Sequence, residues 1–159
     1  MQTVKWSLAT LLLVSAIAIG QTPSARSNGQ SLYLPIYSHV WYGQADSSGK
    51  PMKTLVSVAV SIRNTDPNKP IRVTSAQYFD TDGKKLREFV PAVKTIAPMG
   101  TLELFIPRSD DSGGSGANFV IIWKADAAVN PPLVEAFHAH LEGGRSLGFL
   151  TSARPILIE

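Results

Sequence analysis

The stretch Thr54-Leu55-Val56-Ser57-Val58-Ala59-Val60-Ser61-Ile62-Arg63 decides the fold class of this chain. Branched apolar residues occupy every second position from Val56, and small or polar residues lie between them. This is the period of a β-strand with one buried face. Residues 64–70, Asn-Thr-Asp-Pro-Asn-Lys-Pro, then indicate a turn. We therefore predict a strand over residues 54–63 that buries Val56, Val58, Val60 and Ile62.

Eight further segments have strand composition and are separated by turn signals. They cover residues 31–37, 71–79, 84–90, 102–106, 119–124, 133–141, 147–152 and 155–158. No segment after residue 20 keeps a helical period over ten or more residues. Seven to nine short strands predict an all-β fold, a single immunoglobulin-like antiparallel β-sandwich, with a closed barrel as the alternative. The expected core adds Val73, Leu104, Phe119, Ile121 and Trp123.

The first 20 residues have the composition of a secretory signal peptide. Lys5 provides a positive start, residues 8–19 are apolar, and Ala18 and Gly20 are suitably small for a cleavage site. The apolar run is shorter than the ~20 residues of a spanning helix, so cleavage is favoured over retention as an anchor. We predict a signal peptide over residues 1–20, a flexible spacer over 21–30 and a β-sandwich domain over 31–159. The expected location is secreted or periplasmic, with no membrane span after cleavage.

Charge and cysteine content exclude several classes of function. The chain has 15 basic and 12 acidic residues. Removing residues 1–20 takes away only Lys5, which leaves 14 bases, 12 acids and a net charge of +2. No stretch gathers five or six bases, so we expect no nucleic-acid partner. There is no Cys, so an exported domain must depend on its apolar core, which a chain of this length can build.

An acidic glycine loop precedes the most apolar strand. Residues 110–118 read Asp-Asp-Ser-Gly-Gly-Ser-Gly-Ala-Asn. Part of this loop resembles the nucleophile signature of chymotrypsin-like serine proteases, with Ser112 as the nucleophile and His39 as the base. Asp110 and Ser115 stand where that signature has Gly and Pro, and the domain is too small for a double barrel. We therefore expect no enzyme, and a small secreted hydrolase using Ser112 remains an alternative.

The same loop is the candidate recognition surface. Its expected residues are Arg63, Asn64, Asp110, Asp111, Ser112, Gly113, Gly114, Gly116 and Asn118. We expect Arg63, the last residue of the predicted strand over residues 54–63, to pair with Asp110 or Asp111 and so to hold the loop in place.

Two other groups of residues could bind a metal ion. Residues 80–83, Asp-Thr-Asp-Gly, resemble the start of a calcium loop, but no closing Glu follows, and a hairpin turn explains them. His138 and His140 share one face of a strand, as a zinc pair would. With three His and no Cys in the chain, we expect both to face solvent. No cofactor or metal is predicted, and a calcium- or zinc-dependent binding module remains an alternative.

Several stretches together resemble the domain of unknown function 3124 family, whose members are uncharacterised exported bacterial proteins. The matching pieces are residues 32–39, 60–66, 78–80 with Gly83, 112–119 and 123–125. The resemblance implies an exported single-domain protein and brings no activity, cofactor or catalytic residue. The function expected from the sequence is therefore a non-enzymatic module that binds a protein or glycan of the cell envelope.

Overall fold

The computed structural model describes residues 25–157, and this part of the chain is all-β. Its twelve strands are β1 Ser27–Ile36, β2 His39–Ala45, β3 Pro51–Leu55, β4 Ser57–Arg63, β5 Ile71–Phe79, β6 Lys85–Glu88, β7 Lys94–Ile96, β8 Thr101–Ile106, β9 Ala117–Val129, β10 Leu133–Glu142, β11 Arg145–Ser152 and β12 Arg154–Ile156. The all-β prediction is confirmed. The strand count exceeds the expected seven to nine, because β2 and β7 lie in segments without a clear alternation and β3 is separate from β4. The described residues contain no helix that could cross a membrane.

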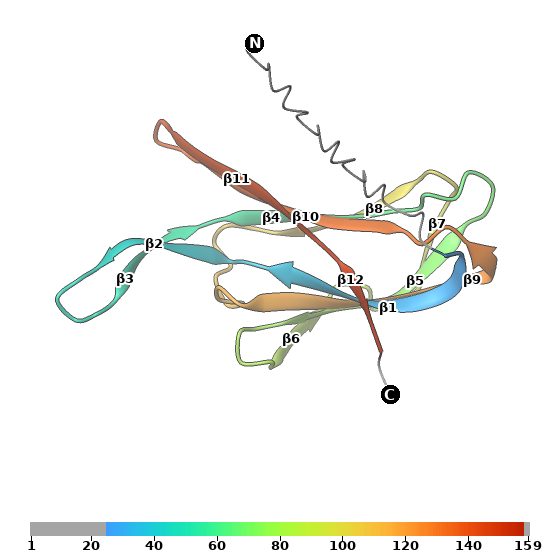
Figure 1. Ribbon diagram of the computed structural model, residues 1–159, viewed down its shortest axis with the longest axis horizontal. Coiled ribbons are helices and arrows are strands. Elements are labelled where there is room, and N and C mark those ends of the chain that lie inside the picture. Colours follow the sequence, from blue (N-terminus) through green and yellow to red (C-terminus); the bar gives the residue numbers. More distant parts are fainter. Residues whose placement is uncertain (1–24, 158–159) are drawn as a thin grey trace, which may run out of the picture.

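Two antiparallel sheets form the body of the protein. The larger has the order β12-β1-β9-β5-β6, with β7 also paired to β5, and the smaller has the order β11-β10-β4-β8. Figure 1 shows them as two layers, with the β2–β3 hairpin as a separate ribbon that projects beyond both. Consecutive strands often lie in different sheets, so the fold depends on contacts between residues distant in sequence.

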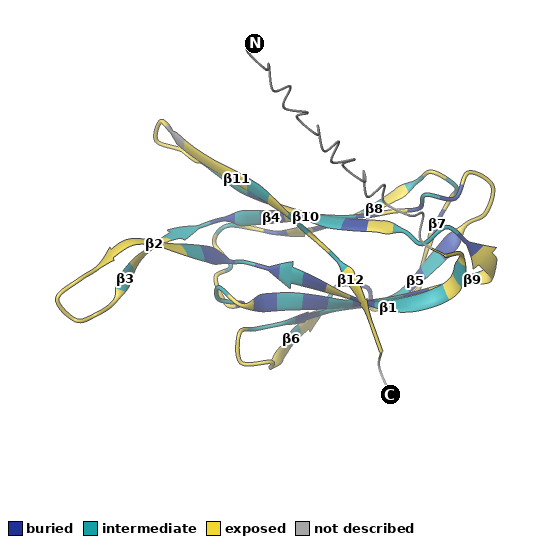
Figure 2. Cartoon of the chain, in the orientation of Figure 1, coloured by how far each residue is buried: buried dark blue, intermediate teal, exposed yellow. Residues whose placement is uncertain are grey.

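Both sheets contribute to one hydrophobic core. Its largest fully buried side chains are Trp123, Tyr78 and Phe119, all from the larger sheet. All nine residues expected in the core are buried, so this prediction is confirmed. Buried residues recur along β1 and β9, alternating with more exposed ones, as the two-residue period requires (Figure 2).

The strand expected over residues 54–63 is in fact interrupted. The break falls at Val56, whose N–H donates to the Ser38 carbonyl at 3.1 Å. Here the chain leaves the β2–β3 ribbon and enters the smaller sheet as β4, so one alternating sequence serves two separate strands.

The spacer expected over residues 21–30 is also too long. β1 begins at Ser27, which pairs with Val129 near the end of β9. Gly29 lies so close to β9 that an added Cβ would be 2.9 Å from the Trp123 carbonyl oxygen. Residues 27–30 are polar, so their composition does not predict a strand. They form one because they pair with β9.

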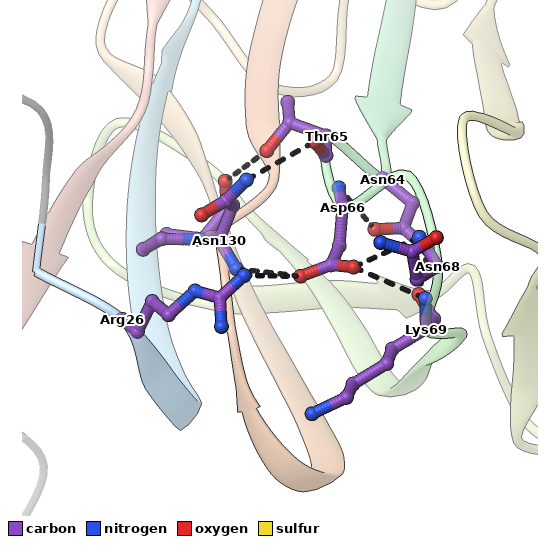
Figure 3. A network of polar contacts seen from close by, with 8 residues as sticks. Arg26, Asn64, Thr65, Asp66, Asn68, Lys69 and Asn130 are labelled. Atoms are coloured by element: carbon purple, nitrogen blue, oxygen red, sulfur yellow. Dashed lines mark hydrogen bonds and ion pairs between the residues drawn. The ribbon is translucent and has the colours of Figure 1, made fainter.

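A buried carboxylate, Asp66, organises one end of the body (Figure 3). Only 1 % of its side chain is exposed. Its Oδ1 accepts the backbone N–H groups of Asn68 and Lys69 at 3.0 and 3.1 Å, and its Oδ2 accepts that of Asn130 at 3.2 Å. These bonds, that of Asn68 above all, hold the pKa of Asp66 below its usual value. The carboxylate therefore ties the turn after β4 to the connection between β9 and β10.

Asp66→Asn is expected to lower the Tm by several degrees at pH 7, because an amide NH₂ would face backbone donors that the carboxylate now satisfies. The folded pKa is depressed, so this stabilisation is present above the unfolded pKa of about 4 and is lost as pH falls below it. The Tm difference between the two proteins should thus shrink at pH 3. Asp82→Asn, at an exposed turn, is the control. Equal Tm values for wild type and Asp66→Asn at pH 7 would contradict this role.

Candidate functional site

The backbone of the glycine loop, residues 110–118, is held in place by hydrogen bonds to Ser38 and Thr81. The Ser38 N–H donates to the Gly114 carbonyl and the Thr81 N–H donates to the Gly113 carbonyl, both at 2.9 Å. The Thr81 hydroxyl donates to the Gly113 carbonyl and accepts the Gly116 N–H, both at 3.0 Å. Gly113 is buried against the Tyr78 hydroxyl, and Gly114 has a φ of +77°. Gly113 thus lets the loop pack closely against Tyr78. The backbone of the loop is held by hydrogen bonds, which the sequence did not predict.

The two carboxylates of this loop pair with bases from neighbouring hairpins. Arg87 Nη2 lies 3.2 Å from Asp110 Oδ2, and Lys53 Nζ lies 2.9 Å from Asp111 Oδ2. The hydrogen bond from Lys53 holds the pKa of Asp111 below its usual value. Both acidic groups are therefore already engaged within the protein.

The expected pairing of Arg63 with Asp110 or Asp111 is wrong. Arg63 Nη1 instead lies 3.0 Å from Glu135 Oε2, across the β4–β10 pair. The reason is the length of β4: Arg63 is its last residue, and the glycine loop lies beside the start of the strand, about 20 Å away.

The candidate recognition residues consequently lie at two ends of the body. Asn64 is buried beside Arg63, and its Nδ2 donates to the carbonyls of Lys69, Ile96 and Ala97. Asn118 belongs to β9, where it pairs with Pro35 and Phe79. The structure brings residues 110–116 together as one loop but places Arg63 and Asn64 at the other end of β4, where Asn64 Oδ1 accepts the Asp66 N–H at 3.0 Å.

Ser112 and His39 lie near the same loop but have different partners. The Ser112 hydroxyl donates to Asp110 Oδ1 at 2.6 Å. The His39 ring packs edge-on against Trp41 with 4.6 Å between centroids, and burial, followed by the charge of Lys53, lowers its pKa. Within residues 25–157 no hydrogen bond joins Ser112 to His39. The hydroxyl therefore lacks the His acceptor on which the hydrolase alternative depends.

The prediction that both β10 histidines face solvent is wrong. His138 is fully buried, and its Nε2 accepts the Tyr37 N–H at 3.1 Å. His140 is partly buried, with Nδ1 3.2 Å from the Leu55 carbonyl oxygen. Both continue the inward face that Val134 begins on β10. No group of three or more His, Cys, Asp or Glu side chains suited to a metal occurs in the described part of the chain.

The β2–β3 ribbon has two faces with different neighbours. One face carries Trp41 and Lys53, which are cross-strand partners, and it rests on the glycine loop. Trp41 Nε1 donates to Ser115 Oγ at 3.2 Å, and Lys53 forms its ion pair with Asp111. The opposite face carries Val40, Tyr42 and Thr54. The glycine loop thus fixes the position of the ribbon and leaves this second face free of it.

A cleft of about 470 Å³ opens between that second face and the β10–β11 hairpin. It is lined by Val40, Tyr42, Thr54, His140, Glu142, Gly143, Ser146 and Leu147, and most of the exposed lining is apolar. Figure 1 shows the two hairpins projecting from the same end of the body and diverging. The volume of this cleft is typical of ligand sites.

Sequence reasoning did not identify this cleft. A usable signal was present in Val40-Trp41-Tyr42, three consecutive large apolar or aromatic residues that lie outside every predicted strand. His140, two residues beyond the buried His138, was another. The cleft was missed because its two walls are at least 86 residues apart in sequence, from Thr54 to His140, and meet only through the sheet order.

The fold and the cleft define an all-β protein of two antiparallel sheets with a site between two projecting hairpins. The chain belongs to the family described as "Protein of unknown function (DUF3124)", which matches residues 29–156. No curated protein matches the chain. It is similar to a solved structure from Thermotoga maritima, "Crystal Structure of Thermotoga maritima 1070", with 10% identity and a TM-score of 0.43, over 79% of this chain and 92% of that one.

Proposed function

We propose that this protein is an exported, non-enzymatic binding module that holds an apolar segment of a partner protein in the cleft between the β2–β3 and β10–β11 hairpins. The apolar lining of that cleft carries the proposal. The lining contains polar side chains, those of Tyr42, Thr54, His140, Glu142 and Ser146, but most of its exposed surface is apolar. An apolar segment of a protein therefore matches this surface better than a glycan does. Export is supported by the signal-like composition of residues 1–20.

We infer that the glycine loop serves this function by positioning the ribbon. Asp110 and Asp111 are paired within the protein, and Ser115 accepts a hydrogen bond from Trp41. Such a loop contributes to affinity by keeping one wall of the cleft in place before the partner arrives. Direct recognition by the loop, as predicted from the sequence, would instead require these internal bonds to be exchanged for bonds to the partner.

We also infer an immunoglobulin-like sandwich whose terminal strands have exchanged sheets. The pairs β4–β8 and β5–β9 correspond to the B–E and C–F pairs of that fold. β1 lies beside β9, the position that strand G ordinarily takes, and β10 lies beside β4, the position of strand A. This exchange supports the proposed site, because it brings the β10–β11 hairpin opposite the ribbon that follows β1.

The cleft proposal predicts that a negative charge on either wall weakens binding of the partner segment. Peptides that bind the protein, used as residues 21–159, would be selected from a random display library. The affinity of each selected peptide would then be measured for wild type and for the variants. Val40→Asp and Leu147→Asp should each weaken binding at least tenfold, since the carboxylate must be desolvated by the bound apolar segment. Leu157→Asp makes the same type of change at a 99% exposed position outside the cleft and should have no effect. Equal affinities for wild type and both cleft variants, with unchanged Tm values, would refute the site.

The alternatives can be tested on the same protein. A serine-reactive probe is expected to leave Ser112 unlabelled, since its hydroxyl is held by Asp110. Calcium and zinc are expected to leave the Tm unchanged, since linkage would otherwise raise it. Labelling at Ser112 would favour the hydrolase, and a metal-dependent rise in Tm would favour the metal-dependent module.

A further inference from the structure

The outer face of the smaller sheet carries a row of exposed apolar side chains. The pairing registers place Phe105, Ala59, Phe137 and Leu150 side by side across β8, β4, β10 and β11. The three large residues Phe105, Phe137 and Leu150 are 59%, 45% and 60% exposed. Ala59, between Phe105 and Phe137, is also exposed. The ring of Phe137 lies over Gly148 of β11, and its remaining surface faces outward with the rest of the row.

The positions beside this row have the composition of an ordinary solvated face. On one side the next residues of the four strands are Glu103, Ser61, Glu135 and Ser152. One isolated exposed apolar residue needs no explanation, but a continuous row across four strands marks an interaction surface. The row is therefore the part of this face whose exposed apolar side chains indicate a binding partner.

We propose that this row is the interface of a homodimer in which the face packs on the same face of a second copy, about a two-fold axis parallel to the strands. That axis reverses the strand order, so β8 lies opposite β11 and β4 lies opposite β10. Phe105 then faces Leu150, and each Phe137 faces the small Ala59 of the other copy. Large residues meet small ones at the centre, which is the interdigitation that packed sheets require.

The alternative in-plane axis, perpendicular to the strands, lacks this complementarity. It would set Phe137 against Phe137 and leave Ala59 against Ala59, with a clash at one point and a gap at the other. With the parallel axis, Glu135 faces Ser61 and Glu103 faces Ser152, so this packing brings no like charges together. The steric fit thus favours a second copy in one orientation.

The size of the face predicts a weak dimer. Four strands about 4.8 Å apart and about 24 Å long present roughly 450 Å² per copy, or about 900 Å² in total. That area lies at the low end of specific interfaces, where association is transient. The dimer does not depend on the proposed cleft, because the cleft is lined by inward-facing His140, on the opposite side of β10.

Sedimentation equilibrium of the chain from residue 21, at concentrations up to about 1 mM, tests the interface. Wild type should show reversible dimerisation, and Phe137→Asp should raise the dimer dissociation constant at least tenfold, because each interface would bury two carboxylates. Leu157→Asp, off this face, is the matched control and should dimerise as wild type does. A wild type that is monomeric throughout, or unaffected dimerisation of a folded Phe137→Asp variant, would overturn the proposal.

The axis has its own test. Ala59→Phe and Phe137→Ala should each weaken dimerisation, the first by overpacking and the second by leaving a gap. Their combination should recover most of the affinity, because each large residue would again face a small one. The Tm of each variant at low concentration checks that the monomer is intact. Failure of the double variant to recover affinity would overturn the proposed orientation.

Discussion

Gly113→Ala is expected to cost roughly 3 kcal/mol or more of unfolding free energy, or to prevent folding altogether. An added Cβ would overlap the Tyr78 hydroxyl and approach the Ala117 Cβ to 2.8 Å. Neither side can yield: Tyr78 is fully buried and hydrogen-bonded to Ser38, and the Gly113 carbonyl accepts two bonds from Thr81. The change therefore disturbs the core and the glycine loop together.

Denaturant unfolding at pH 7 measures this effect against two related variants. Gly83→Ala lies at a turn with a φ of +80° and open space around it, so it should cost only about 1 kcal/mol of backbone strain. Adding Tyr78→Phe to Gly113→Ala removes the nearest overlapping atom and should recover part of the loss. A Gly113→Ala protein as stable as Gly83→Ala would show that the loop can move away from Tyr78.

The second large effect is acid destabilisation through His138. Lowering the pH from 7 to 4 should remove about 3 kcal/mol of stability, because burial lowers the pKa of His138 to about 4. Its ring stacks on Phe149 with 4.5 Å between centroids, and its Nδ1 has no hydrogen-bond partner. An unfolded histidine titrates near 6.5, so the unfolded chain binds more protons between pH 6.5 and 4. The stabilisation is thus present above pH 6.5 and lost as pH falls through this window.

His138→Leu separates this contribution from those of other groups. Loss of the acceptor for the Tyr37 N–H should lower stability at pH 7 by about 1–3 kcal/mol, while the pH dependence between 7 and 4 becomes shallower. His39→Gln is the comparison, because the pKa of His39 is also lowered by burial but its side chain keeps some exposure. Denaturant unfolding at pH 7, 5.5 and 4 gives the slopes. An unchanged slope in His138→Leu would exclude His138 as the titrating group.

Local patterns were sufficient to predict most of the strands and the nine core residues that the sequence analysis names. The alternation from Val56 to Ile62 and the apolar run from Phe119 to Trp123 both form buried strand faces. The Asp-Gly hairpin turn before β6 is also confirmed, since the Gly83 N–H donates to the Asp80 carbonyl at 3.1 Å between the paired strands β5 and β6. These features follow from the residues themselves, because a two-residue period and a positive φ are local requirements.

The candidate site could be predicted only in part. The glycine loop was identified as unusual, but its partners Lys53, Arg87 and Thr81 were not, because they lie up to 58 residues away in sequence. The same limitation explains the wrong prediction for Arg63. A charged residue has many possible partners in sequence, and strand order alone selects among them.

From the sequence alone we could predict the all-β class, the buried faces of several strands and the family to which the chain belongs. These properties depend on side-chain period, turn chemistry and motif identity, all of which are local. Only the tertiary structure decided that His138 lies in the core, that the glycine loop holds a ribbon, and that two distant hairpins enclose a cleft. The order of strands in the two sheets produces these features, because it brings together strands that are distant in sequence. No local pattern in those strands indicates which of them become neighbours.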